Sequence, residues 1–183
     1  MTRDEALGLL HEHVPTANLQ NHCLAVGWIM RALAERLGLD ASDADRWEVA
    51  GILHDLDYAQ TAEDFERHGR VTVEVLAGRI DEEQAHAILA HADKAPRESL
   101  MDRALYAADP VTGFIVAAAL VRPDKSLAAV EVGSLKKRWK EKTFARGASR
   151  EQMAACSELG LERDEFLALS LAAMQAHAEE LGL

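Results

Sequence analysis

The sequence predicts an all-helical fold, and three of its features lead to that prediction. Leucine and alanine dominate, β-branched runs are scarce and aromatic residues make up only 5% of the chain, a composition that favours helices over sheets. Apolar residues recur at helical spacing in segment after segment. The chain has four prolines and no segment rich in glycine, serine or proline that would act as a linker. We therefore expect one helical domain over residues 1–183.

The first long helix is predicted over residues 18–37, where apolar residues recur at helical spacing and Gly38 follows as a terminator. Extending its apolar stripe back towards the N-terminus reaches His22. Ser42 is the candidate N-cap of the next helix, since acidic residues follow in its first turn. We expect that helix to run to about Leu56.

Next along the chain, Thr61 or Asp64 is expected to start a third helix that runs through His68. Asp81 and Gln84 have the spacing of a capping pair, which predicts a further helix directly after Asp81.

The second half of the chain begins with a long apolar helix from about Leu100, which Pro110 is expected to kink or restart. Ser149 and Gln152 form another capping pair at the start of a short helix. A final amphipathic helix is predicted over residues 162–181, and its apolar face makes a homodimer plausible.

Charge and composition exclude several classes of function. The formal charge is −11, which argues against nucleic-acid binding as the main activity. The N-terminus is acidic and lacks the apolar stretch of a signal peptide. The apolar run 104–121 is interrupted by polar residues and is expected to be too short and broken to span a membrane. The two cysteines, Cys23 and Cys156, are too far apart for a zinc motif. We expect a cytoplasmic protein with reduced thiols.

Polar residues that are unusual for a protein core carry the functional prediction. His22 lies on the apolar stripe of its helix, His54 and Asp55 are adjacent inside an apolar run, and Asp109 lies in the most apolar stretch of the chain. A buried, unpaired carboxylate costs several kcal/mol. A divalent cation shared by these four residues is the most economical explanation, and imidazole with carboxylate suits Mn, Fe, Co, Ni or Zn better than Ca.

Each of these residues alone has a purely structural interpretation. His22 is compatible with a hydrogen-bonded core histidine, and His54 with Asp55 is compatible with a structural pair. Asp109 before Pro110 fits an N-cap at the start of a restarted helix. The combination is much harder to explain by structure alone.

The ordered set of motifs resembles the HD superfamily of helical, metal-dependent phosphohydrolases. The resemblance covers roughly residues 18–120, and the common His-Asp-Ile-Gly of that family reads His-Asp-Leu-Asp here. The matching segments are Asn21-His22-Cys23-Leu24-Ala25-Val26, Gly51-Ile52-Leu53-His54-Asp55-Leu56-Asp57, His68-Gly69, Ile88-Leu89-Ala90-His91-Ala92-Asp93 and Leu105-Tyr106-Ala107-Ala108-Asp109. This resemblance implies an HD-type helical bundle with its metal-binding core at about 18–120, followed by a basic segment and C-terminal helices over 125–183.

The same resemblance implies which residues hold the metal. His22, His54, Asp55 and Asp109 would bind one ion, and Asp55 would bridge to a second ion held by His68 and His91. The sequence leaves one ion and two ions open. It also leaves open that His68 is a surface residue and that His91 merely ends its helix, where the helix dipole favours a histidine.

The implied reaction is hydrolysis of a phosphate ester or anhydride of a small soluble compound such as a nucleotide. A bound cation lowers the pKa of a water and supplies hydroxide, with Asp55 as a central catalytic ligand, and it neutralises phosphoryl oxygens as charge builds on them. His91, Asp57 and Lys94 are the candidates for protonating the leaving group or contacting the phosphate, and the sequence does not rank them. Lys94 is equally compatible with a solvated loop lysine.

A basic segment over residues 135–146 stands out in an otherwise acidic chain. It is compatible with a solvated amphipathic helix that Trp139 anchors. The functional alternative is a cationic lip in which Lys137 and Lys140 bind phosphate oxygens of the substrate. RNA binding by this segment is the least favoured alternative, given the net charge.

Two further functions stay open beside the phosphohydrolase. Certain HD-superfamily members use four histidines and two aspartates as a di-iron oxygenase site, and this chain has such a set. The other alternative is a non-catalytic domain that binds a nucleotide or a protein partner, although a binding module has no need of the full ligand set.

Overall fold

The chain folds into eleven α-helices and one short 3₁₀ helix with no strand, which confirms the all-helical prediction. This computed structural model describes residues 1–183. The elements are α1 (Arg3–His13), α2 (Ala17–Arg36), α3 (Ala41–Leu53), α4 (Tyr58–Thr61), α5 (Arg70–Val75), α6 (Glu82–His91), α7 (Leu100–Leu120), α8 (Val132–Trp139), α9 (Arg150–Ala154), η1 (Ala155–Leu159), α10 (Arg163–Gln175) and α11 (Ala178–Leu181).

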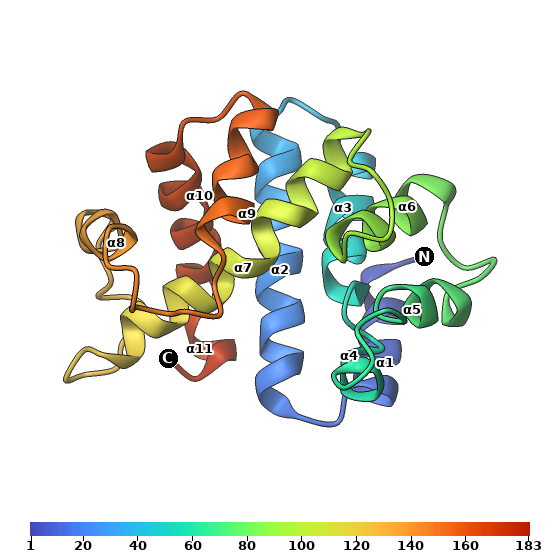
Figure 1. Cartoon of the computed structure of the whole chain (residues 1–183), viewed down its shortest axis with the longest axis horizontal. Coiled ribbons are helices and arrows are strands. Elements are labelled where there is room, and N and C mark those ends of the chain that lie inside the picture. The colour runs from blue at the N-terminus through green and yellow to red at the C-terminus, as the bar shows by residue number, and fades with distance from the viewer.

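Two long helices, α2 and α7, form the centre of the molecule (Figure 1). The first half of the chain, α1 and α3 to α6, lies on one side of this pair, and α8 to α11 lie on the other. α2 packs most extensively against α3, and it also contacts α7 and α10. α7 packs against α6 on one side and against η1 and α9 on the other.

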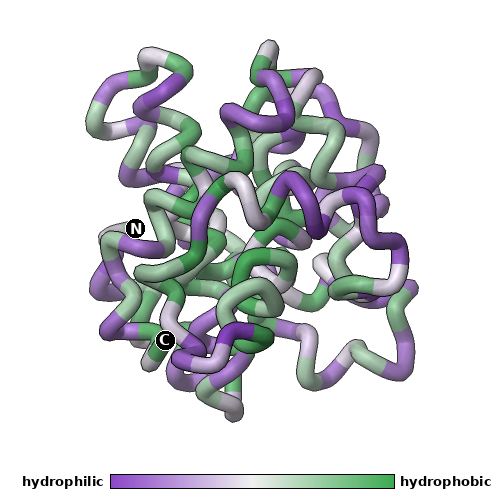
Figure 2. Tube along the Cα trace, turned by 90° about the vertical axis from the view of Figure 1, so that its left-hand side faces the viewer, coloured by the Kyte–Doolittle hydropathy of each residue, from purple (hydrophilic) through white to green (hydrophobic).

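One contiguous apolar core joins the two halves, with buried residues from Ala6 in α1 to Leu181 in α11. The largest fully buried side chains include Trp47, Phe114 and Phe166, which come from three different helices. Figure 2 shows the hydrophobic stretches running through the interior and hydrophilic residues along the peripheral loops.

Side-chain caps define the helix starts. The predicted pair at Asp81 and Gln84 forms a full capping box, and the Ser149 hydroxyl accepts a hydrogen bond from the Gln152 amide. The N-cap prediction at Ser42 is wrong: Asp40 caps α3 by accepting from the Asp43 amide. Asp ranks with Ser as an N-cap, so composition alone did not separate the two positions.

The expected third helix is wrong in its extent. A four-residue α4 ends at Thr61, and α5 begins only at Arg70. Gly69 is the N-cap of α5 with a φ of +78°, a left-handed conformation that a continuous helix cannot contain. His68 therefore lies in a turn instead of a helix.

α7 is continuous across Pro110, so the helix does not restart there, and the structural alternative of Asp109 as an N-cap is wrong. Packing against α2 and α6 outweighs the loss of one backbone hydrogen bond at the proline. With 21 residues, α7 is long and apolar enough to cross a membrane by length and composition, contrary to the expectation of a short, broken segment. Most of that stretch is buried inside the bundle, as in a core helix.

The predicted C-terminal helix is interrupted near its end. α10 stops at Gln175, and α11 follows after His177 leaves the helical conformation. The His177 ring stacks on the Trp28 ring with centroids 4.1 Å apart, which fixes α11 against α2.

Candidate metal centre

The structure brings all six predicted metal ligands together from five parts of the chain. They are His22 in the middle of α2, His54 at the C-cap of α3, Asp55 in the turn that follows, His68 in the turn before α5, His91 at the end of α6 and Asp109 in the middle of α7. Within this cluster, three trios have ligand atoms close enough together to hold an ion. The trios are His22, His54 and Asp55; His54, His91 and Asp109; and Asp55, His68 and His91.

The Asp55 carboxylate lies at the centre of the cluster. Its Oδ1 is 3.5 Å from Nε2 of His54, 3.4 Å from Nε2 of His68 and 3.5 Å from Nε2 of His91. Its Oδ2 is 3.6 Å from Nε2 of His22. Asp109 approaches two of these histidines from α7, with Oδ1 3.2 Å from Nε2 of His22 and 3.9 Å from Nε2 of His54. One carboxylate thus faces four imidazole nitrogens, an arrangement suited to bridging two ions.

Each histidine is held by its other ring nitrogen. Nδ1 of His54 donates to the Gly51 carbonyl at 2.7 Å, and Nδ1 of His91 donates to the Ile88 carbonyl. His68 donates from Nδ1 to Oδ1 of Asp57 at 2.8 Å. Because Nδ1 is the donor in each case, Nε2 is the ring atom that faces the cluster and can bind a metal ion.

His22 is fixed by a relay through a threonine. The Thr112 hydroxyl donates to the Asp109 carbonyl at 2.9 Å, so it can only accept from Nδ1 of His22, 2.8 Å away. Thr112 is not among the residues predicted from the sequence. Its position three residues after Asp109, on the same face of a helix, was the available signal.

The charge balance of the cluster depends on protons or on a cation. Burial works against ionisation, but the pKa values of Asp55 and Asp109 are held well below the usual range by His54 and His22 and the other histidines that face them. No lysine or arginine pairs with either carboxylate. Burial lowers the pKa of His22, yet its hydrogen bonds to Asp109 and Asp55 outweigh burial and raise it to about 10.

Two observations test whether the cluster fits a metal. Nε2 of His91 is buried and has no hydrogen-bond partner, which is rare for a buried polar atom. Nε2 of His22 and Nε2 of His54 are 3.3 Å apart and need a proton or a cation between them. Four imidazoles with two carboxylates form a donor set for Mn, Fe, Co, Ni or Zn. The residues fit a transition-metal ion.

A close contact between two helices brings His22 and His54 together. A Cβ on Gly51 of α3 would lie 2.7 Å from the Cα of Gly27 in α2, so the two backbones can approach this closely only because both residues are glycine. Gly51 also supplies the carbonyl that holds His54. The glycine pair therefore sets both the distance between the helices and the orientation of one ligand.

Asp57 does not face the centre of the cluster. It is 1% exposed; its Oδ1 accepts from His68 and its Oδ2 accepts from the Thr72 amide at 3.0 Å. Both oxygens are thus occupied, so the geometry does not favour the predicted proton-donor role of Asp57. Its contacts fit a residue that positions His68. Thr72, which holds its other oxygen, is a second residue not predicted from the sequence.

The predicted phosphate-binding lysines lie in different places. Lys94 follows α6 closely; its side chain is 10% exposed and its Nζ lies 5.7 Å from the Phe65 ring centroid. The Phe65 ring in turn packs on His68, with centroids 4.7 Å apart. Lys94 is therefore near the His68 edge of the cluster.

The structure does not bring Lys137 and Lys140 to the cluster. They are exposed at the end of α8, which contacts α10 and α7 and lies across the central helix pair from α3 and α6 (Figure 1). Trp139 packs edge-to-face on Phe114. This contact fits the alternative in which Trp139 anchors a solvated helix, and it does not fit a cationic lip over the cluster.

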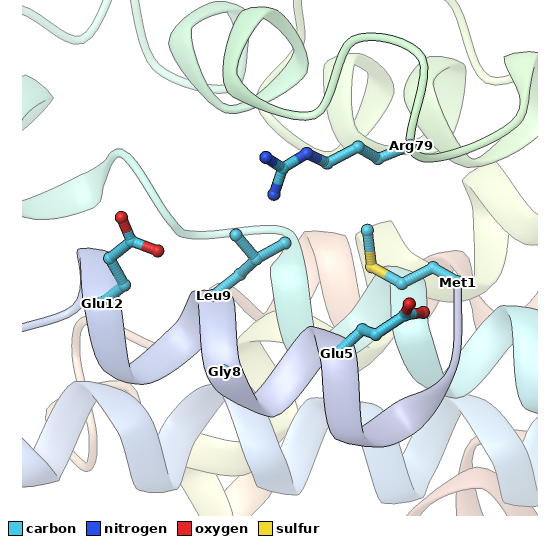
Figure 3. A pocket seen from close by; sticks show the side chains of 6 residues that line it. All are labelled: Met1, Glu5, Gly8, Leu9, Glu12 and Arg79. Atoms are coloured by element: carbon cyan, nitrogen blue, oxygen red, sulfur yellow. The ribbon is translucent and has the colours of Figure 1, made fainter.

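A cavity of about 600 Å³ lies elsewhere, between α1 and Arg79 in the turn after α5 (Figure 3). It contains none of the cluster residues, and its charged lining is Glu5, Glu12 and Arg79. The free cysteines, Cys23 and Cys156, are both buried. The chemistry of the molecule is concentrated at the histidine–aspartate cluster.

Comparison with known proteins agrees with this location. The sequence model of the HD domain family matches residues 19–119, a segment that contains all six cluster residues and more than half of the chain. No curated protein and no solved structure matches the chain.

Proposed function

Because the chain belongs to the HD domain family, we propose that it is a metal-dependent phosphohydrolase that cleaves a phosphate ester or anhydride of a small soluble compound. The observation that carries the proposal is the convergence of four Nε2 atoms on Asp55, with that of His91 buried and unpartnered. A buried site of this kind is stable only with a cation or with protons in its place.

The proposed ligands are the six cluster residues, with Asp55 shared between two ion positions. A divalent cation bound there would supply a Lewis acid for phosphoryl oxygens and lower the pKa of a water. The chain fixes the ligand geometry: Gly51, Ile88, Asp57 and Thr112 each hold one histidine through Nδ1. Held in this way, the imidazoles need little reorganisation when the substrate binds.

Lys94 is the proposed contact for phosphate oxygens. Its side chain is mostly buried, and its one ion-pair partner, Glu66, is 91% exposed and 3.4 Å away. An exposed carboxylate at this distance is a weak partner. Lys94 is therefore able to turn from Glu66 to a phosphate at the edge of the cluster.

A di-iron oxygenase is the second candidate, because the set of four histidines and two aspartates is complete and convergent. The two candidates differ in their products. The hydrolase releases inorganic phosphate with a range of divalent metals, and the oxygenase consumes dioxygen with iron only.

The test combines metal analysis with two assays on the full chain. We expect the purified protein to hold about one or two equivalents of transition metal, and chelation followed by Mn²⁺, Co²⁺, Ni²⁺ or Mg²⁺ to restore phosphate release from a panel of phosphate esters. His91→Ala should lose metal and activity, while His11→Ala, at an exposed histidine of α1, should keep both. Two irons with dioxygen uptake and no phosphate release would favour the oxygenase, and no bound metal would contradict both.

A further inference from the structure

The two most exposed ligands of the metal cluster lie together at one edge. The side chains of His22 and Asp109 are 23% and 29% exposed, while the other four ligands are between 0% and 8% exposed. These two residues belong to α2 and α7, so a substrate reaches the cluster from the groove between these helices. The Phe65 and Tyr58 rings, by contrast, pack on His68 at another edge.

A cavity of about 340 Å³ continues from this open edge. On α2 it is lined at positions 18, 21, 22 and 25, and on α7 at 112, 113, 116 and 120. Both sets have the spacing of one helix face. The α2 set includes His22, and the α7 set continues the face that carries Asp109. The cavity is therefore an extension of the metal centre along the two helices.

The far wall of the cavity comes from the C-terminal segment. Leu181 and Leu183 close it, and the Asn21 side chain donates to the Leu181 carbonyl at 3.3 Å. The stacking of His177 on Trp28 fixes the same segment. This wall lies outside residues 19–119, the part that the family model matches.

The side chains that line the cavity are mainly apolar, and His22 is the only one of them that can carry a charge. Ala25, Val116, Leu181 and Leu183 provide apolar surface, Asn21 provides an amide, and no lysine, arginine or carboxylate side chain lines the cavity. Its size and its mainly apolar lining with few polar groups are those of a small-molecule site. A second phosphate placed there would find no cation to balance its charge.

We propose that this cavity is the subsite for the organic group of the substrate, and that the substrate is a phosphomonoester whose organic group is uncharged and largely apolar. The inference rests on the proposed function, with the phosphate at the cluster and the ester oxygen directed into the groove. Hydrolysis there breaks the bond between phosphorus and that oxygen. Water supplies the new oxygen on phosphorus, and one proton of that water goes to the leaving alkoxide, which departs as the alcohol.

Phosphonates test the subsite without requiring catalysis. Calorimetry measures the binding of methylphosphonate and butylphosphonate to the Mn²⁺-loaded protein. Because each buried methylene contributes a factor of about four, three more of them should give butylphosphonate at least about tenfold tighter binding. A butane-1,4-bisphosphonate should bind more weakly than butylphosphonate, since its second charge enters an uncharged cavity.

Two glycines provide a matched pair of variants. Gly113 lies on the groove face of α7 and Gly8 lies in α1 beside the remote cavity; both are exposed, and a Cβ at either would meet no atom within 4 Å. Figure 3 shows the surroundings of Gly8. Gly113→Phe should fill the groove and bring the butyl-to-methyl affinity ratio close to one, whereas Gly8→Phe should keep the ratio of the unmodified protein.

Equal binding of the two phosphonates by the unmodified protein would overturn the subsite, and so would an unchanged ratio in Gly113→Phe. If Gly113→Phe loses metal or fails to fold, the chain-length series from methyl- to hexylphosphonate on the unmodified protein decides alone. Absence of hydrolysis with every metal would remove the proposed function, while the phosphonate ratios would still decide the subsite.

Discussion

The helix pair α2 and α3 contains two buried carboxylate sites that are neutralised in opposite ways. Glu48 in α3 is 3% exposed and bonds to two arginines, with Oε1 2.8 Å from Nε of Arg3 and Oε2 2.6 Å from Nε of Arg31. Asp55, two residues beyond the end of the same helix, is 6% exposed and faces only histidines.

The difference lies in whether the countercharge is permanent. A guanidinium stays charged at any physiological pH, so the Glu48 site is complete without a ligand and links α1, α2 and α3. Imidazoles carry charge only when protonated, and a neutral imidazole can give its Nε2 lone pair to a metal ion. A carboxylate with arginines is a structural site, and a carboxylate surrounded by imidazoles is ready for a metal.

The largest expected effect is the loss of activity on removal of the Asp55 carboxylate. Asp55→Ala should lower phosphate release by at least about 10²–10³-fold, the scale on which single charge-stabilising groups act in catalysis, and it should remove bound metal. The helical circular dichroism should stay largely unchanged. Full activity in this variant would end the metal-centre interpretation.

Asp57→Asn tests the positioning of His68. Loss of the carboxylate that holds a metal-ligating histidine typically weakens metal binding by about 10- to 100-fold, and we expect that range in a metal titration. Asp102→Asn is the matched control, because Asp102 is also fully buried and bonds to a histidine, His86, at 3.0 Å outside the cluster. Equal metal affinity in the two variants would show that Asp57 has no such role.

Glu48→Gln tests the other site. We expect a loss of about 2 kcal/mol in the free energy of unfolding, typical of hydrogen bonds to charged groups, in denaturant titrations of the metal-free protein. Metal content and activity per folded molecule should not change. A loss of metal affinity in this variant would mean that the Glu48 site and the metal cluster are not independent.

The pH dependence of metal binding follows from His22. Its pKa of about 10, raised above the ordinary 6.5, means that it is protonated at pH 7 in the metal-free protein. That proton stabilises the metal-free fold fully below about pH 6.5, and this contribution is lost as the pH rises towards 10. A metal must displace the proton, so its affinity should rise about tenfold per pH unit across the neutral range. Calorimetry in buffers of different ionisation enthalpy should detect about one released proton, and none would contradict this assignment.

The smallest effect concerns the lysines. Lys94→Ala should raise KM for a phosphate ester by roughly fivefold, the scale of a partly screened ion pair, with less effect on kcat. The double variant Lys137→Glu and Lys140→Glu should leave KM unchanged, because these residues lie on α8 away from the cluster. A raised KM in the double variant with an unchanged KM in Lys94→Ala would instead support phosphate binding by the lysines of α8.

The sequence by itself determined the helical class, the capped starts of α6 and α9, and four cluster residues, His22, His54, Asp55 and Asp109. These features are local or ordered along the chain. A cap requires two residues three positions apart, and polar residues inside apolar runs stand out before any folding is considered. The resemblance to the HD superfamily added His68 and His91. The residues around them in the sequence did not distinguish a metal ligand from a surface or helix-ending histidine.

Tertiary structure alone decided what each polar residue contacts. Asp57 holds His68, and Thr112 connects His22 to the Asp109 carbonyl. Lys137 lies apart from the cluster. The groove beside His22 needs α2, α7 and the C-terminal leucines, which lie more than 150 residues apart in the chain at its extremes. Contacts between distant segments depend on how helices pack, and the periodicity of one helix carries no information about which face of another it will meet.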